Sequence, residues 1–208
     1  MQIPRREQLR LDHPWVYKLY KPVSYLRWLA RGRTLPPVHV YKERTIREYG
    51  RRHGLRTWVE TGTYLGFMVE ELRCDFDRII TIELDAELCR IVRQRFAGLS
   101  HIEVVEGDSG HKLREVCAGL SEPAIYWLDG HFQPNIGTMM GGETPVLHEL
   151  ETLFKHWRPG TVVLIDDARL FGERPDYRSL KAVIEQVKTF DERLSVEVRD
   201  DIIRISLK

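Results

Sequence analysis

Apolar and polar residues alternate along the chain in a pattern that, after residue 56, predicts strands and helices in regular succession. Short apolar runs bounded by Gly, Asp or Pro are typical of strands, and apolar positions spaced three or four apart are typical of helices. The predicted strands are 57–60, 78–83, 101–107, 124–129 and 161–167. The predicted helices are 66–72, 86–96, 111–120, 143–157 and 178–190. The last stretch, 194–208, alternates on both sides of Asp200 and Asp201, which predicts an antiparallel hairpin.

Five strand–helix units followed by a hairpin predict an α/β fold with a doubly wound, mostly parallel sheet of seven strands. Right-handed crossovers between parallel strands place helices on both faces of such a sheet. We therefore expect one domain over residues 57–208, preceded by a basic helical N-terminal extension over residues 1–56.

The N-terminal extension carries an apolar stripe at helical spacing, formed by Val16, Leu19, Tyr20, Val23, Leu26 and Leu29. Pro22 lies inside this stripe, so we expect one or two short helices with an interruption there. Amphipathic helices usually cover a protein core. We expect the stripe to cover the acceptor side of a pocket or the partner in a homodimer, with a membrane surface as the alternative. Residues 34–40 predict a Pro-stiffened linker, and residues 41–54 predict a further helix.

The formal net charge of +1 conceals a strong asymmetry. Residues 1–56 contain 14 Lys or Arg against 4 Asp or Glu, while residues 57–208 contain 18 against 27. A nucleic acid, an anionic lipid surface or the acidic body of the same chain could each pair with the basic extension, and we favour the acidic body.

The composition and the lack of targeting signals in the sequence favour a globular protein over a membrane or secreted one. Hydrophobic residues make up 42% of the 208 residues and charged residues 30%, as in ordinary globular proteins. No apolar run approaches the roughly 20 residues that a membrane span requires, and the first residues lack the apolar core of a signal peptide. The three cysteines are odd in number and lack metal-ligand spacing, which favours a reducing compartment. We therefore predict a cytoplasmic protein.

The residues that follow each predicted strand form the candidate site, because ligands of doubly wound sheets bind beyond the carboxyl ends of the strands. The first strand ends in the order Glu60, Gly62, Gly66, where glycine allows the backbone to approach a ligand closely. A tight strand-to-helix turn explains these glycines equally well. The second strand ends at Glu83, 21 residues beyond Gly62, where an acid can accept both hydroxyls of a ribose.

The other three strands also end in polar side chains, namely Asp108 with Ser109, Asp129 with His131, and Asp166 with Asp167. Asp108 is suited to bind an adenine amino group or, alternatively, to cap the helix that follows it.

Five segments of the chain, VETGTYLG, IELD, GDS, LDGH and IDDAR, occur in the order found in class I S-adenosylmethionine-dependent methyltransferases, which residues 57–208 resemble. The spacing E-x-G-x-x-x-G also differs from the dinucleotide fingerprint G-x-G-x-x-G, which argues against NAD. The resemblance implies methyl transfer from S-adenosylmethionine to a nucleophile above the fourth strand. It also implies a set of cofactor-binding residues, namely Glu60, Gly62, Thr63, Gly66, Glu83, Asp108, Ser109 and Asp129.

Asp129, Asp166 and Asp167 resemble the metal site of catechol-type and macrolide-sugar O-methyltransferases. Carboxylates at neighbouring strand ends repel one another unless a cation neutralises them, and their oxygens suit Mg²⁺, Mn²⁺ or Ca²⁺. Such a divalent metal, with Mg²⁺ favoured, would bind the acceptor hydroxyl and lower its pKa. The alternative is that Asp166 caps the next segment while Asp167 pairs with Arg169.

Phe132 occupies the position at which catechol-type enzymes carry a lysine base. His131 is then the nearest candidate for a catalytic base, next to Asp129, although it is equally suited to orient Asp129 or the cofactor. Residues 132–145 contain three Gly and two Pro, and we expect this connection to form a lid over the acceptor.

These features favour a metal-assisted O-methyltransferase that acts on a small hydroxylated molecule, such as a sugar or a glycosylated metabolite. One alternative is methylation of RNA or another nucleic acid, with the basic extension contacting phosphates. This alternative is disfavoured because LDGH differs from the N/D-P-P-Y/F motif of exocyclic amino methylases and no cysteine follows the fourth strand. A second alternative is a non-catalytic nucleoside-binding or scaffold protein.

Overall fold

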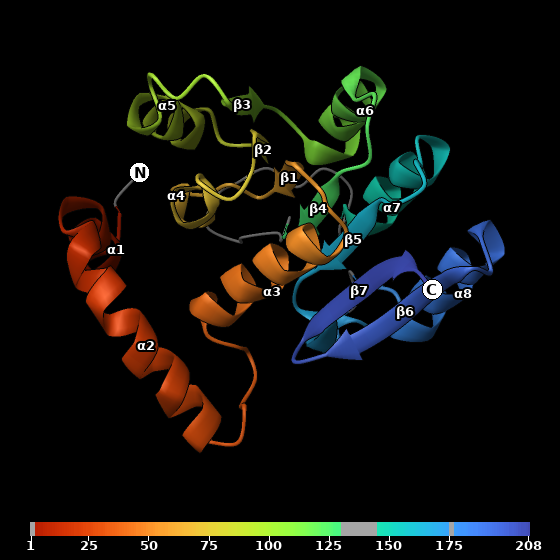
Figure 1. Ribbon diagram of the computed structural model, residues 1–208, viewed down its shortest axis with the longest axis horizontal. Coiled ribbons are helices and arrows are strands. Elements are labelled where there is room, and N and C mark those ends of the chain that lie inside the picture. The colour runs from red at the N-terminus through yellow and green to blue at the C-terminus, as the bar shows by residue number, and fades with distance from the viewer. Residues whose placement is uncertain (1–2, 130–144, 175–176) are drawn as a thin grey trace.

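The computed structural model describes residues 3–129, 145–174 and 177–208. Its centre is a seven-stranded sheet with the strand order β3-β2-β1-β4-β5-β7-β6 (Figure 1). The strands are β1 (Thr57–Thr61), β2 (Arg78–Glu83), β3 (Ile102–Glu106), β4 (Ile125–Leu128), β5 (Val162–Ile165), β6 (Leu194–Arg199) and β7 (Ile202–Leu207). Strands β1 to β5 are parallel, while β7 runs antiparallel to both β5 and β6. The predicted α/β class, strand number and terminal hairpin are confirmed.

Helices cover both faces of the sheet, as right-handed crossovers require. The helices are α1 (Arg5–Asp12), α2 (Pro14–Ala30), α3 (His39–Arg52), α4 (Phe67–Leu72), α5 (Ala86–Arg95), α6 (Ser109–Gly119), α7 (Val146–Lys155) and α8 (Leu180–Phe190). Helices α6, α7 and α8 share one hydrophobic core with the sheet, and α3, α4 and α5 share the core on the opposite face. Helix α3 therefore packs on the sheet like the crossover helices, although it precedes the first strand.

The turn of the terminal hairpin lies at the two residues predicted for it, Asp200 and Asp201. Asp200 and Asp201 both have positive φ, +48° and +67°, between β6 and β7. Asp residues tolerate this left-handed conformation better than most because their short side chains hydrogen-bond locally.

The N-terminal helices break at a different place from the one predicted. The expected interruption at Pro22 is wrong, because α2 continues through this residue and the chain breaks instead at His13, before Pro14. Pro14 occupies the first turn of α2, where its missing N–H costs nothing. Pro22 removes one hydrogen bond, but its ring is exposed and α2 is held against the body by side chains on either side of it.

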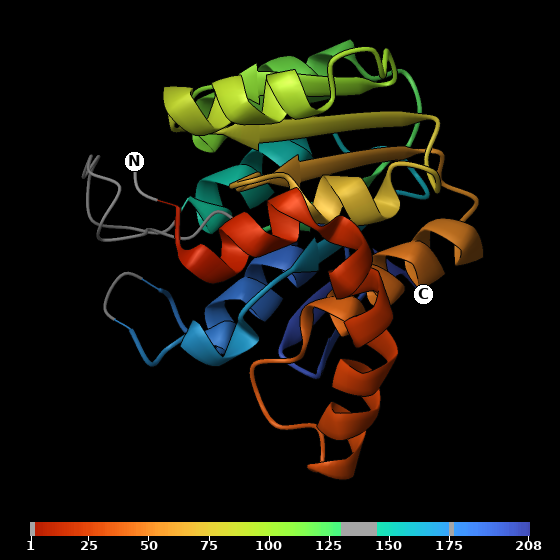
Figure 2. The same cartoon turned by 90° about the vertical axis from the view of Figure 1, so that its left-hand side faces the viewer.

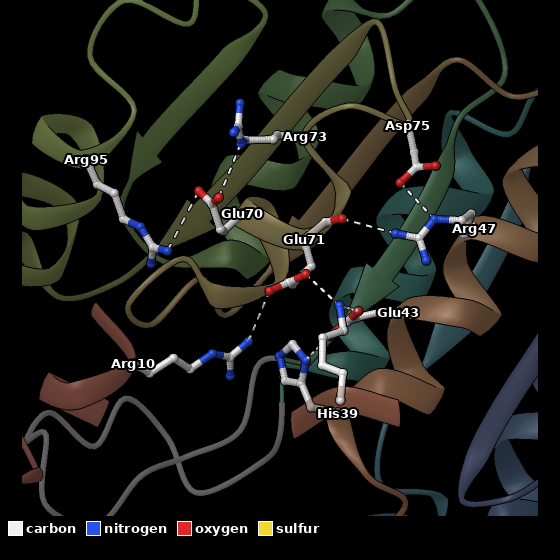
Figure 3. A network of polar contacts seen from close by, with 10 residues as sticks. Arg10, His39, Glu43, Arg47, Glu70, Glu71, Arg73, Asp75 and Arg95 are labelled. Carbon is white, nitrogen blue, oxygen red and sulfur yellow. Dashed lines mark hydrogen bonds and ion pairs between the residues drawn. The ribbon is translucent and has the colours of Figure 1, made fainter. Parts of the chain in front are cut away.

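Charged side chains tie the N-terminal helices to the acidic body (Figure 3). The Glu43 carboxylate on α3 is fully buried and contacts His39 at 2.8 Å and the ammonium of Lys21. Lys21 also donates to Glu71 at 2.5 Å, and Arg10 lies 4.0 Å from the same carboxylate. The favoured pairing of the basic extension with the acidic body is therefore confirmed for Lys21 and Arg10, which both reach Glu71.

The apolar stripe of α2 does not pack on the body of this chain, because its side chains are exposed, with Leu19 at 71% and Leu26 at 64%. The expectation that the stripe covers the acceptor side of a pocket or the partner in a homodimer stays a prediction. The inward face of α2 is instead formed by Tyr17, Lys21 and the 3% exposed Trp28, whose indole N–H donates to the Thr34 carbonyl at 2.7 Å. Figure 2 shows α2 extending beyond the rest of the body. Among the helices that the structure describes, none combines the length and apolar character needed to cross a membrane.

Replacing Glu43 by Gln is expected to cost on the order of 3 kcal/mol of folding stability at neutral pH, because Lys21 loses a buried anionic partner. Burial acts to raise the pKa of Glu43, but its hydrogen bonds and charge interactions with His39 and Lys21 outweigh burial and hold the pKa below its ordinary value. Glu43 therefore contributes its full share of folding stability above the pKa of about 4.3 that it has in the unfolded chain. This stability is lost as the pH falls through the lower pKa of the folded protein.

Urea unfolding of the wild type and Glu43→Gln at neutral and acidic pH measures this difference. Glu48 is exposed on the same helix and provides the control, since Glu48→Gln should change stability by no more than about 0.5 kcal/mol. Equal losses in the two variants would contradict the role of Glu43.

Candidate functional site

The residues that follow the parallel strands lie side by side along the carboxyl edge of the sheet. Backbone hydrogen bonds of 2.8–3.2 Å join each strand end to its neighbour, from Gly107 to Glu83, from Gly62 to Ile82, from Asp129 to Thr61 and from Asp166 to Leu128. The strand ends thus follow the spatial order β3, β2, β1, β4, β5. The structure therefore brings the candidate residues that it describes to one edge.

The glycine-rich loop after β1 depends on glycine for its shape. Gly62 and Gly66 have φ of +83° and +70°, a region that residues with a side chain rarely adopt. A Cβ at Gly66 would also lie 2.8 Å from the Phe96 ring of the α5 segment. The tight-turn explanation of Gly66 is therefore correct. This tight turn is compatible with a ligand that binds beside the loop.

Glu60 is buried inside the sheet edge. It is 2% exposed, and the Thr81 hydroxyl donates to one of its carboxylate oxygens at 2.7 Å. The Thr63 hydroxyl in turn is hydrogen-bonded to Thr81. Burial raises the pKa of Glu60 well above its ordinary value, and the charges of Asp129 and Glu83 add to this effect. Burial thus favours the protonated form of Glu60, and the residue holds the Thr81–Thr63 pair beneath the loop.

Glu83 joins the glycine-rich loop to the end of β2. Its two carboxylate oxygens accept the backbone N–H of Tyr64 at 2.7 Å and that of Asp85 at 3.0 Å. The residue is 9% exposed, and burial raises its pKa while these backbone hydrogen bonds oppose the rise. Each oxygen has further lone-pair capacity, so the carboxylate remains able to accept from a ligand.

Asp108 is the N-cap residue of α6, which confirms the helix-capping reading of this residue. Its carboxylate accepts the backbone N–H of His111 at 3.3 Å, and its side chain is 38% exposed beside the strand end. A cap uses only part of the acceptor capacity of a carboxylate. Asp108 thus remains accessible to a ligand.

Glu149 on α7 is a site residue that the sequence analysis missed. It is fully buried, and burial raises its pKa to about 7, while the nearby hydroxyls of Ser109 and Thr61 oppose the rise. The signal that could have found it is its place in the buried apolar face of α7, beside Val146, Leu150 and Leu153. An acid within an apolar stripe indicates a buried polar contact.

Lys42 on α3 is the second missed residue, and it reaches the acidic end of β5. Its ammonium forms an ion pair with Asp166, which is 3% exposed and also accepts the Asp167 backbone N–H at 2.9 Å. Burial acts to lower the pKa of Lys42, but the charges of Asp166, Asp129 and Asp167 outweigh it and raise the pKa. Lys42 is therefore a permanent cation at this edge. Its only sequence signal is its position one turn before the buried Ile46 on the same face of α3.

Asp167 turns toward a different cation. Its backbone is left-handed, with φ +56°, and its carboxylate accepts from Arg169 at 2.6 Å. Arg169 also contacts Asp201 in the terminal hairpin. The alternative expectation that Asp167 pairs with Arg169 is confirmed.

The predicted metal ligands Asp129, Asp166 and Asp167 do not fit a divalent ion in this arrangement. Two of the three carboxylates are paired with Lys42 and Arg169, which a metal would have to displace. Within residues 3–129, 145–174 and 177–208, no three His, Cys, Asp or Glu side chains are arranged to hold a metal ion. His131 and residues 132–144 of the expected lid lie outside the described residues, so their assigned roles stay predictions.

Comparison with known proteins relates this architecture to solved structures. No protein family and no curated protein matches the sequence. An O-methyltransferase from Bacillus cereus, solved in complex with SAH, is 18% identical with a TM-score of 0.61 over 90% of each chain. The O-methyltransferase TomG from Streptomyces achromogenes, involved in tomaymycin synthesis and solved with SAM, is 17% identical with a TM-score of 0.56 over 99% of each chain.

A third structure is MycE, a methyltransferase of the mycinamycin biosynthetic pathway, solved with Mg, SAH and mycinamycin VI. It is 16% identical with a TM-score of 0.53, over 80% of this chain and 48% of that chain. At these identities the likeness concerns the fold. The chain therefore has the fold of the class I S-adenosylmethionine-dependent O-methyltransferases.

Proposed function

We propose that the protein transfers a methyl group from S-adenosylmethionine to a hydroxyl oxygen of a small molecule. The observation that carries this proposal is the row of acceptor side chains along the carboxyl edge, in which Asp108, Glu83 and the loop of Gly62 follow the adjacent strands β3, β2 and β1. Structures with this fold have been solved with SAM or SAH.

The residues of this edge fit the chemistry of the proposed cofactor. Glu83 retains acceptor capacity for the two ribose hydroxyls, and Asp108 retains it for the adenine amino group. The backbone turn at Gly62 and Gly66 leaves the first strand end without side chains at these two positions. We place Thr63, Ser109 and Glu60 around this cradle as groups that support its shape.

Bound S-adenosylmethionine supplies a methyl group on a positively charged sulfur. The acceptor hydroxyl would take up that methyl group, with adenosylhomocysteine as the leaving group, and would lose its proton. We propose that His131 accepts this proton and that Asp129 orients the acceptor beside it. A general base of this kind contributes typically ~10²–10⁴-fold to a rate.

A small-molecule acceptor is favoured over a nucleic acid. TomG is described as an enzyme of tomaymycin synthesis and MycE was solved with mycinamycin VI, which supports a hydroxylated metabolite or its sugar as the acceptor class. Four cations of the basic extension, Arg10, Lys21, Lys42 and Arg47, face carboxylates of the same chain. We assign no step to a divalent metal, because two of its three expected ligands, Asp166 and Asp167, already have cationic partners.

Glu83→Gln is expected to weaken the binding of S-adenosylmethionine and adenosylhomocysteine by about 10-fold, because two charge-assisted hydrogen bonds become neutral ones. Isothermal titration calorimetry measures this loss. Glu106 pairs with Glu83 in the β2–β3 register but is exposed and bound to Arg93, so Glu106→Gln is the matched control and should bind normally. Unchanged affinity in a folded Glu83→Gln protein would exclude Glu83 as the ribose ligand.

Incubation with methyl-tritiated S-adenosylmethionine and a panel of hydroxylated sugars and glycosides tests the reaction itself. We expect label in a small product that resists nuclease, and a ~10²–10⁴-fold slower transfer by His131→Ala if His131 is the base. Label found only in RNA would favour the nucleic-acid alternative. Cofactor binding without transfer to any acceptor class would favour the non-catalytic alternative.

A further inference from the structure

We propose that the ammonium group of Lys42, and not a divalent metal ion, is the resident cation of the acidic centre formed by Asp129, Asp166 and Asp167. This inference rests on the proposed function, because it assigns the charge balance of the same site. Lys42 comes from α3, so the N-terminal extension would complete the site that the sheet begins.

Burial requires that the negative charges at this centre be balanced. Asp166 and Asp167 are 3% and 5% exposed, and the charge of Asp129 acts on both Asp166 and Lys42. Carboxylates that water cannot solvate need a counter-charge or a proton. Lys42 supplies that charge to Asp166, and Arg169 supplies it to Asp167.

The position of Lys42 is fixed by its neighbours along α3. Tyr41 is buried and donates its hydroxyl to Asp200 at 2.5 Å, while the Arg204 guanidinium donates to the same hydroxyl at 3.2 Å. On the other side, Glu43 is held by Lys21 and His39. A side chain between two anchored residues is preorganised, so its ammonium does not have to be recruited from solvent.

A lysine ammonium differs from a metal ion in what it offers an acceptor. It has three N–H donors, of which one is directed to Asp166, so others can bind an acceptor oxygen. It does not dissociate, and chelators do not remove it. Lys42 would thus position the acceptor hydroxyl without making transfer depend on a divalent ion.

Titration with Mn²⁺, followed by electron paramagnetic resonance, tests the assignment without any activity measurement. We expect the wild type and Lys42→Arg to bind no stoichiometric Mn²⁺ at submillimolar concentrations. Lys42→Met removes the cationic partner of Asp166 and should bind one Mn²⁺ at least about 10-fold more tightly than the wild type. Lys18 is exposed on α2, and Lys18→Met is the matched control that should behave as the wild type.

One tightly bound Mn²⁺ per wild-type chain, lost in Asp166→Asn, would overturn the proposal. So would a folded Lys42→Met protein that gains no metal affinity. If Lys42→Met does not fold, the Mn²⁺ titrations of the wild type and of Lys42→Arg show whether the centre holds a metal ion. Calorimetry with S-adenosylmethionine on the same wild-type sample separates the two claims, since cofactor binding together with Mn²⁺ binding would refute only the role of Lys42.

A second inference comes from the outward face of α2 and does not depend on the site. The face carries Trp15, Val16, Leu19, Tyr20, Val23, Leu26 and Leu29, all of which are exposed. At about 3.6 residues per turn, Leu19, Val23 and Leu26 lie on the side of the helix opposite the buried Trp28, and the others flank them. Figures 1 and 2 show α2 at the margin of the molecule. Contiguous exposed apolar residues of this kind mark an interaction surface.

The charges around this face identify its partner. Helix α2 contains no Asp or Glu, while Lys18 and Arg27 are exposed on it and Arg5 and Arg6 are exposed on α1. A second copy of α2 in a two-fold contact would bring cations to cations. An anionic lipid surface offers apolar chains to the stripe and phosphates to the cations, and Trp15 and Tyr20 suit the boundary between them. We propose that α2 lies on an anionic membrane surface without spanning it.

Cosedimentation with vesicles tests this second proposal. We expect binding to phosphatidylglycerol-containing vesicles, little binding to pure phosphatidylcholine, and release at high salt. Leu19→Asp should reduce binding by at least about 10-fold, because it places a charge in the apolar face. Val198→Asp changes an exposed valine on β6 in the same way and should bind like the wild type.

Absence of binding to anionic vesicles would overturn the lipid assignment, as would equal binding to both vesicle types. A wild type that is dimeric by light scattering and becomes monomeric on Leu19→Asp would assign the face to a second copy instead.

Discussion

The packing of α3 against the sheet determines where the positive charge of the N-terminal segment lies. Ile46 and Tyr49 enter the same core as Trp58 and Trp127 of the central strands. This contact fixes the axis of α3, and the axis carries Lys42 to the acidic end of β5. The same helix carries Glu43, which receives Lys21 from α2 and thereby holds the preceding helices. The apolar contact between α3 and the sheet thus positions both Lys42 and the preceding helices α1 and α2.

The charged groups along the carboxyl edge of the sheet differ from one end to the other, with carboxylates near β2 and β3 and cations near β5. Glu60 and Glu149 are buried acids, and burial raises the pKa of both, so the edge carries two carboxyl groups that ionise less readily than exposed ones. Glu83 and Asp108 keep spare acceptor capacity toward β2 and β3, while Lys42 and Arg169 bring cations toward β5. A cofactor with a cationic sulfur and ribose hydroxyls suits the first region, and an acceptor oxygen suits the second.

The sheet and the row of strand-end residues could be predicted from the sequence because they depend on local patterns. Alternating apolar runs specify strands and crossovers, and Glu83 follows from its place after the second run. Lys42 and Glu149 could not be found in this way, because a charged residue is read as exposed unless the helix face it shares is known. The course of α2 was also beyond prediction. The sequence pattern shows that a helix has an apolar face, but it does not show which surface packs against that face. A proline breaks a helix only where the surrounding contacts do not hold the helix together.

The most direct test is a crystal structure of the protein grown with adenosylhomocysteine and MnCl₂, with anomalous data collected at the manganese edge. We predict the ribose of the ligand against Glu83, the Lys42 ammonium on Asp166, and no anomalous peak among Asp129, Asp166 and Asp167. Ligand density away from the carboxyl edge, or a manganese peak in place of the Lys42 ammonium, would contradict the arrangement described for this site.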